Sequence, residues 1–104
     1  ITLNEINEIS LIAKKENIQY LLLVAPYRYQ LKDPDNTNQP QVRLKGFAKK
    51  NNLVFYDLLD PFYLNQELYG VSLFDDSSHF SVKGHILTAT YLQEQILNLL
   101  KTLN

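Results

Sequence analysis

The sequence predicts an α/β fold with parallel strands. Two short apolar runs, residues 18–25 and 53–57, are separated by a polar stretch and by a segment whose apolar residues have helical spacing. The first run shows no polar alternation after Tyr20, which is typical of a strand buried on both faces of a sheet. The alternation of such runs with amphipathic segments favours parallel strands that are covered by helices.

Residues 2–16 are expected to form the first helix. Thr2 and Glu5 match the capping-box pattern, in which each side chain bonds a backbone N–H at the start of a helix. Asn17 is suited to the turn that ends this helix, because asparagine tolerates left-handed backbone angles. The apolar positions recur at three- to four-residue steps and form one face: Leu3, Ile6, Ile9, Ile12 and Ala13.

Between the two apolar runs, the sequence predicts a loop and then a helix. Pro26 ends the first strand, and residues 27–39 are polar, with aspartate, asparagine and proline of the kind that form turns. Residues 40–51 have apolar side chains at helical spacing. Gly46 weakens that helix by ~1 kcal/mol relative to alanine.

Two further helices are expected after the second strand. Asp60 is placed as the N-cap and Pro61 as the first residue of a short helix that Gly70 ends. Ser81 is placed as the N-cap of the longest helix, whose apolar stripe is expected to belong to the core. This stripe consists of Val82, Ile86, Ala89, Leu92, Ile96, Leu99, Leu100 and Leu103.

The predicted sheet is narrow for the number of helices around it. Parallel sheets are covered on both faces, and a complete domain of this type has more than two strands. An open strand edge also invites pairing with another polypeptide. We therefore expect further strands from a longer chain or from a partner, including a homodimer through open sheet edges.

The composition narrows the class of protein. A chain of 104 residues forms one domain at most, and its formal net charge of −1 gives no basic surface of the kind that binds nucleic acid. The absence of cysteine excludes structural disulfides and thiolate metal sites. No apolar run approaches the ~20 residues of a membrane-spanning helix.

Chemically active side chains concentrate in residues 74–85, just before the longest helix. Asp76 precedes His79 by three residues, and a carboxylate can hold an imidazole in one tautomer and stabilise its protonated form. Catalytic groups of parallel sheets lie beyond the carboxyl ends of the strands. Tyr27 and Arg28 follow the first strand, so they are expected near this pair as substrate-binding residues.

The segment around Asp76 and His79 resembles the last motif block of the SGNH (GDSL-type) hydrolases. That block has an aspartate three residues before the catalytic histidine. An apolar residue, a small polar residue and, after two more positions, a glycine then follow. Phe80, Ser81 and Gly84 match these positions, and a long helix comes next. The resemblance covers nearly the whole chain and is specific in this one block.

This resemblance implies a three-layer α/β/α, flavodoxin-like fold with a parallel sheet. Residues 1–104 are then the C-terminal portion of one SGNH-like hydrolase domain, with about two strands and three to four helices. The implied activity is that of a serine ester hydrolase or acyl transferase for carbohydrate or lipid esters. In it His79 deprotonates a serine, Asp76 orients His79, and no cofactor takes part.

The other motif blocks of that family are not found in the 104 residues. The family's serine lies in a Gly-Asp-Ser block, and its oxyanion donors are a glycine and an asparagine in two middle blocks. None of the three glycines here precedes an Asp-Ser pair. Because a triad without its nucleophile retains little catalysis, we expect this chain alone to be inactive.

Each of these assignments has an alternative. The chain as a whole is also consistent with a non-catalytic SGNH-like remnant that is used for binding or assembly. Tyr27 and Arg28 also fit a solvated loop, and Ser77 and Ser78 fit turn positions. The residues with donor types suited to a divalent metal ion are Asp75, Asp76, His79 and His85.

Overall fold

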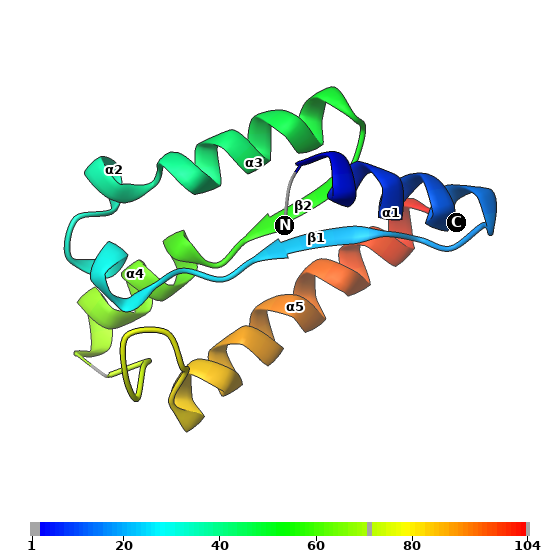
Figure 1. Cartoon of the computed structure of the whole chain (residues 1–104). Coiled ribbons are helices and arrows are strands. Elements are labelled where there is room, and N and C mark those ends of the chain that lie inside the picture. The colour runs from blue at the N-terminus through cyan, green and yellow to red at the C-terminus, as the bar shows by residue number, and fades with distance from the viewer. Residues whose placement is uncertain (1–2, 71, 104) are drawn as a thin grey trace.

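The computed structural model describes residues 3–70 and 72–103 (Figure 1). It is a mixed α/β structure, mostly helical, with a two-stranded parallel sheet, and this confirms the predicted α/β class. The elements are α1 (Leu3–Lys15), β1 (Leu21–Val24), η1 (Arg28–Lys32), α2 (Pro34–Thr37), α3 (Gln39–Lys50), β2 (Val54–Asp57), α4 (Leu59–Tyr69) and α5 (Val82–Thr102).

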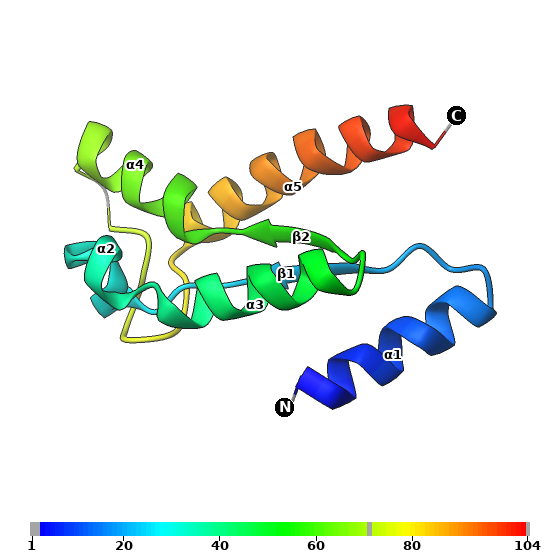
Figure 2. The ribbon, with the colours of Figure 1, turned by 90° about the horizontal axis from the view of Figure 1, so that it is seen from above.

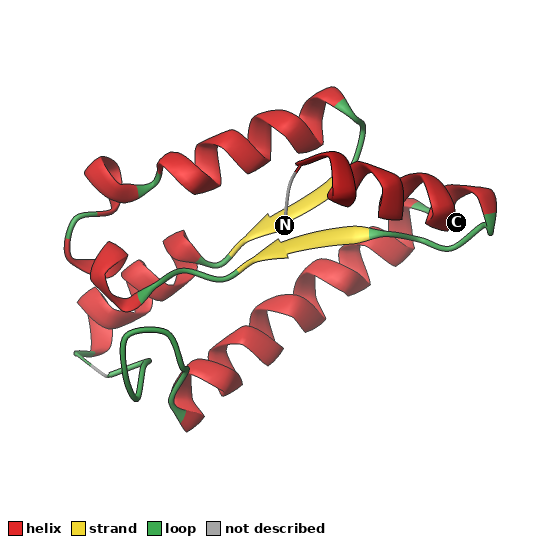
Figure 3. Cartoon of the chain, in the orientation of Figure 1, coloured by secondary structure: helices red, strands yellow, loops and turns green. Residues whose placement is uncertain are grey.

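The sheet is built from β1 and β2, which pair in parallel from Leu21 opposite Val54 to Val24 opposite Asp57. Both arrows point toward the end of the molecule that holds α4 and the loop before α5 (Figures 1 and 3). The segment with Asp76 and His79 therefore lies at the carboxyl ends of the strands, where the sequence placed it.

Helices lie on both sides of the sheet. Viewed from above, α1 and α3 occupy one side and α5 occupies the other (Figure 2). The connection from β1 to β2 passes through η1, α2 and α3, so it is the crossover that a parallel pair requires. α1 lies on the same side of the sheet as α3 (Figure 2).

The buried core gathers near the carboxyl ends of the strands. Phe62 and Leu58 are fully buried there. Leu87 and Tyr91 of α5 pack against this cluster, and they are the residues through which α5 joins the core. The buried cluster consists of Leu31, Leu58, Leu59, Phe62, Leu73 and Phe74.

The prediction that residues 27–39 form a loop is wrong in part, because η1 and α2 lie within them. The cause is Gln30, which is buried and fully bonded. Its side-chain amide donates to the Thr37 carbonyl at 2.7 Å and to Gln41 Oε1 at 2.9 Å, and it accepts from the Tyr27 N–H at 2.9 Å. Because a buried polar side chain needs hydrogen-bond partners, the bonds of Gln30 hold residues 27–41 in a compact helical arrangement.

The ends of the helices agree only partly with the predictions. Asn17 adopts the left-handed conformation with φ 59° and Gly70 with φ 61°, as their turn-forming roles require. Asp60 is not the cap of α4, because α4 begins at Leu59 and the Leu59 N–H is bonded to Asp57 Oδ1 at 2.9 Å. The predicted Thr2 cap lies outside the described residues.

The apolar stripe of α5 is largely exposed, which corrects the expectation that it belongs to the core. Val82 has 74% of its surface exposed and Leu103 has 57%. Ile9 and Ile12 on α1 are likewise at least half exposed. Within residues 3–70 and 72–103 the sheet has two strands, and these cover little of the apolar faces of α1 and α5.

Candidate functional site

Asp76 and His79 are in direct contact. His79 Nδ1 lies 2.8 Å from Asp76 Oδ2 and 3.0 Å from Oδ1. Both side chains are open to solvent, with 79% of the histidine and 57% of the aspartate side chain exposed. The rest of the imidazole is therefore accessible to a reacting group.

Asp76 is held as a charged group by its own loop. Its Oδ1 accepts the backbone N–H of Ser78 at 2.9 Å and of His79 at 2.8 Å. These bonds, together with the His79 ring, lower the pKa of the Asp76 carboxyl to about 2. An ionised carboxylate only accepts hydrogen bonds, so the proton of a neutral His79 sits on Nδ1 and leaves Nε2 with its lone pair.

The loop that carries the pair is a short hairpin closed at its base. Phe74 and Phe80 form an antiparallel bridge, and the Asp75 N–H donates to the His79 carbonyl at 2.8 Å. The Phe80 ring packs 4.7 Å from Phe62 and 5.3 Å from Phe74, centroid to centroid. Through Phe80, the loop that carries the exposed Asp76–His79 pair is thus anchored to buried core residues.

The start of α5 locks the other side of the hairpin. Ser81 Oγ accepts the Gly84 N–H at 3.1 Å and donates to the Ser72 carbonyl at 2.9 Å, which confirms Ser81 as the N-cap. A Cβ added at Gly84 would collide with the Leu73 carbonyl oxygen. Gly84 is therefore the residue that lets α5 approach the hairpin base.

Tyr27 and Arg28 meet this hairpin through the backbone. The Arg28 N–H donates to the Ser77 carbonyl at 3.0 Å, so the segment after β1 is tied to the tip of the loop. The Tyr27 and Tyr29 rings stack on each other, with centroids 6.1 Å apart and an interplanar angle of 19°. Of the two predicted substrate-binding residues, Arg28 thus contacts the loop of the Asp76–His79 pair through its backbone, and Tyr27 precedes it in the chain.

Ser77 and Ser78 take part through their backbone groups, as their turn positions suggest. Asp57 ends β2 and accepts the Leu59 N–H at the start of α4, and burial is the main cause that raises the pKa of its carboxyl. Sequence reasoning missed Phe74 and Phe62 as anchors of the site. The spacing of Phe74 and Phe80 on either side of the pair was the available signal.

A metal site finds no support within residues 3–70 and 72–103, where no group of three or more His, Asp or Glu side chains is placed to hold an ion. His85, one of the candidate ligands, instead packs its ring 5.6 Å from Phe80, edge to face. Among the same residues, no helix is long and apolar enough to cross a membrane.

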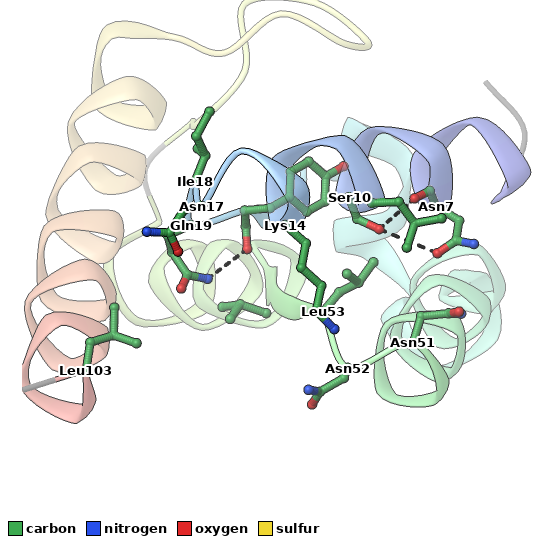
Figure 4. Close-up of a pocket in the computed structure, with 13 residues that line it drawn as sticks. Asn7, Ser10, Lys14, Asn17, Ile18, Gln19, Asn51, Asn52, Leu53 and Leu103 are labelled. Atoms are coloured by element: carbon green, nitrogen blue, oxygen red, sulfur yellow. Dashed lines mark hydrogen bonds between the residues drawn. The ribbon is translucent and has the colours of Figure 1, made fainter.

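A further cavity lies at the opposite end of the strands. It measures about 550 Å³ and opens between α1, the start of both strands and the end of α5 (Figure 4). Lys14, Asn17, Asn52 and Leu103 are among its lining residues, and none of them belongs to the hairpin. The Asp76–His79 pair and this cavity are therefore separate features.

Comparison with protein-family models, with curated proteins and with solved structures finds no match to this chain. The fold and the site together define a mixed α/β chain with a surface carboxylate–histidine pair at the carboxyl ends of parallel strands. Any functional assignment follows from that geometry.

Proposed function

We propose that this chain supplies the Asp76–His79 half of a Ser-His-Asp triad in an SGNH-like serine ester hydrolase or acyl transferase. The observation that carries the proposal is the 2.8 Å contact between His79 Nδ1 and a carboxylate whose pKa is lowered to about 2. Carbohydrate and lipid esters are the proposed substrates, as the resemblance of the segment implies.

The chemistry follows from which ring nitrogen is free. His79 Nε2 would take the proton of a serine hydroxyl as its oxygen attacks the ester carbonyl, and would then give that proton to the leaving alcohol. The positive charge that develops on the ring is stabilised by Asp76. Tyr27 and Arg28, tied to the hairpin through Ser77, would border the bound ester.

We also propose that the sheet belongs to a wider three-layer α/β/α, flavodoxin-like arrangement. Crossovers between parallel strands are right-handed, and α1 lies on the same side of the sheet as α3 (Figure 2). A strand that leads into α1 would then lie along the free edge of β1. The exposed apolar faces of α1 and α5 are surfaces that such strands would cover.

The tautomer of His79 tests the proposed role. Long-range proton–nitrogen NMR of the chain should show the Nδ1–H form of neutral His79. In Asp76→Ala the preference should be lost, while Asp75→Ala, which removes the same charge one residue away, should leave it unchanged. His85 provides an internal reference in each spectrum. An Nε2–H tautomer of His79 in the unsubstituted chain would contradict the role as base.

Ester turnover provides a second test. The chain alone should not hydrolyse activated esters, because it presents a base without the nucleophile that the base would activate. Hydrolysis by the purified chain that disappears in His79→Ala would overturn the claim that the serine comes from elsewhere.

The second candidate function is a non-catalytic remnant used for binding or assembly, and the exposed apolar helix faces favour it. In that case two copies should associate through the open β1 edges at micromolar concentration. The exposed apolar face of α5 would take part in the same contact, so analytical ultracentrifugation should show weaker association for Leu100→Lys. A well-folded, strictly monomeric chain would exclude self-assembly as its role.

A further inference from the structure

A small cavity lies against the base of the hairpin, apart from the Asp76–His79 contact. It measures about 220 Å³ and is open to solvent on one side. Its walls are formed by Arg28, by residues at the end of α4 and by the stem of the hairpin. The lining residues are Arg28, Gln66, Gly70, Ser72, Leu73 and Phe74.

The polar groups of this cavity are of the type that binds an anion. Arg28 is the one charged residue among those that line it, and its guanidinium offers five N–H donors in a planar fork. Gln66 adds a side-chain amide, whereas the Ser72 hydroxyl already donates to the Phe74 carbonyl at 2.9 Å. None of the described lining residues is a carboxylate, so none of them competes with a ligand for the guanidinium.

The floor of the cavity is apolar. Leu73 and Phe74 are 1% and 4% exposed, so they belong to the buried core. Charges and hydrogen bonds next to such a surface are less screened than in open water. An oxyanion beside these two residues would therefore be less screened than one in open water.

Arg28, which supplies the charge of the cavity, also links the cavity to the hairpin. The Arg28 N–H is bonded to the Ser77 carbonyl, between Asp76 and Ser78, while Leu73 and Phe74 form the stem below. A ligand bound to the Arg28 side chain would lie next to the loop that presents His79.

We propose that this cavity binds an oxyanion group, a carboxylate or a phosphate, and that this group is part of the ester substrate. The second half of this statement rests on the proposed function, whereas anion binding itself does not. The substrate class then narrows to esters that carry a negative charge near the scissile bond, with Arg28 as a specificity-determining residue.

Anion binding is tested by NMR titration of the chain with inorganic phosphate. Added phosphate should shift the signals of Arg28, Gln66 and Ser72, and these shifts should reach a plateau as the site saturates. Arg28→Ala should weaken binding by about tenfold or more, the loss expected for a charge-assisted hydrogen bond. Arg28→Lys should keep part of the affinity, because it keeps the charge without the fork. Arg43→Ala, which removes the other arginine of the chain, should bind like the parent.

A second titration asks whether the anion belongs to the substrate. An acetyl ester of glycerol phosphate should shift both the Arg28 and the His79 signals, while free phosphate should shift the Arg28 group alone. Non-saturating shifts, or equal binding by Arg28→Ala, would overturn the site. Saturable phosphate binding without any His79 response to the phosphate ester would leave a simple anion site and overturn its link to the substrate. The His79 tautomer is read in the same spectra, so failure of the base is distinguished from failure of the anion site.

Discussion

The two ends of the sheet differ in how completely they are packed. At the carboxyl ends, Phe62, Leu58 and Leu73 are almost fully buried, and the hairpin above them is closed by backbone bonds. At the amino ends, α1 and the end of α5 leave isoleucine and leucine side chains exposed around an open cavity. The end of the molecule that carries Asp76 and His79 is thus well packed, while the other end has exposed apolar side chains that further strands or helices could cover.

The two ends differ because the hairpin is packed by elements of this chain, whereas the apolar faces of α1 and α5 have few neighbours among the described residues. The hairpin needs only the elements already present, because its anchors come from α4, from α5 and from the hairpin itself. The faces of α1 and α5 need neighbours that two strands do not provide. A chain can therefore hold a well-defined acid–base pair even where its sheet is narrow.

The largest effect is expected at the packed end. Phe62→Ala should destabilise the chain by about 3–5 kcal/mol, since it opens a cavity among Leu58, Phe74 and Phe80. Leu100→Ala, on the exposed face of α5, should cost less than about 1 kcal/mol. Urea unfolding followed by circular dichroism measures both. Equal losses would mean that the α5 face is covered in solution, and the contrast between the two ends would fail.

An intermediate effect is expected for glycine substitutions. Gly84→Ala places a methyl group against the Leu73 carbonyl and should destabilise by about 1–3 kcal/mol, with altered NMR signals of His79. Gly46→Ala is the matched control, because nothing lies within 4 Å of its added Cβ.

At that position in α3, alanine should stabilise the chain by up to about 1 kcal/mol. Thermal melts of the two variants should therefore shift in opposite directions. A neutral Gly84→Ala variant with an unchanged His79 signal would show that the hairpin does not depend on close approach of α5.

The smallest effect is the pH dependence of stability. The folded-state pKa of Asp76, about 2, lies below its ordinary value of 3.8. Its ionised form therefore stabilises the fold fully above that ordinary value, and the contribution declines as the pH falls toward 2. Asp76→Asn should therefore lose less stability than the parent as the pH falls from about 4 to about 2, the range between the two pKa values.

Urea midpoints across that range provide the measurement, and Asp75→Asn controls for the loss of one negative charge. Because Asp76 is solvent-exposed, the change should be small beside that of Phe62→Ala. Identical slopes in the parent and in Asp76→Asn would indicate that the hairpin does not depend on the charge of this carboxylate.

Local signals in the sequence predicted the local structure well. The Ser81 cap and the Asn17 and Gly70 turns depend on neighbouring residues, and they are found as expected. Both strands lie within the predicted runs, but β1 covers only Leu21–Val24 of residues 18–25, and its side chains are half-buried instead of buried on both faces. The contact between Asp76 and His79 also follows from their three-residue spacing within one turn. In each case the interacting groups are close in the chain.

The errors arose where distant residues decide the outcome. Gln30 reaches Gln41, and this bond folds a segment whose polarity alone suggested a loop. The Leu59 N–H at the start of α4 is bonded to Asp57 and not to Asp60, because the end of β2 runs directly into α4. The stripe of α5 has the periodicity of a core face, but periodicity does not supply the strands that would cover it.

The closure of the hairpin by nearby groups has a consequence for folding order. The bonds from Ser81 to Leu73 and from Asp75 to His79 span few residues, so the chain entropy lost in forming them is small. Contacts of such short range form quickly and do not wait for a sheet to assemble. The Asp76–His79 contact would then be formed before any later strand arrives, and a partner segment would meet an imidazole that is already oriented.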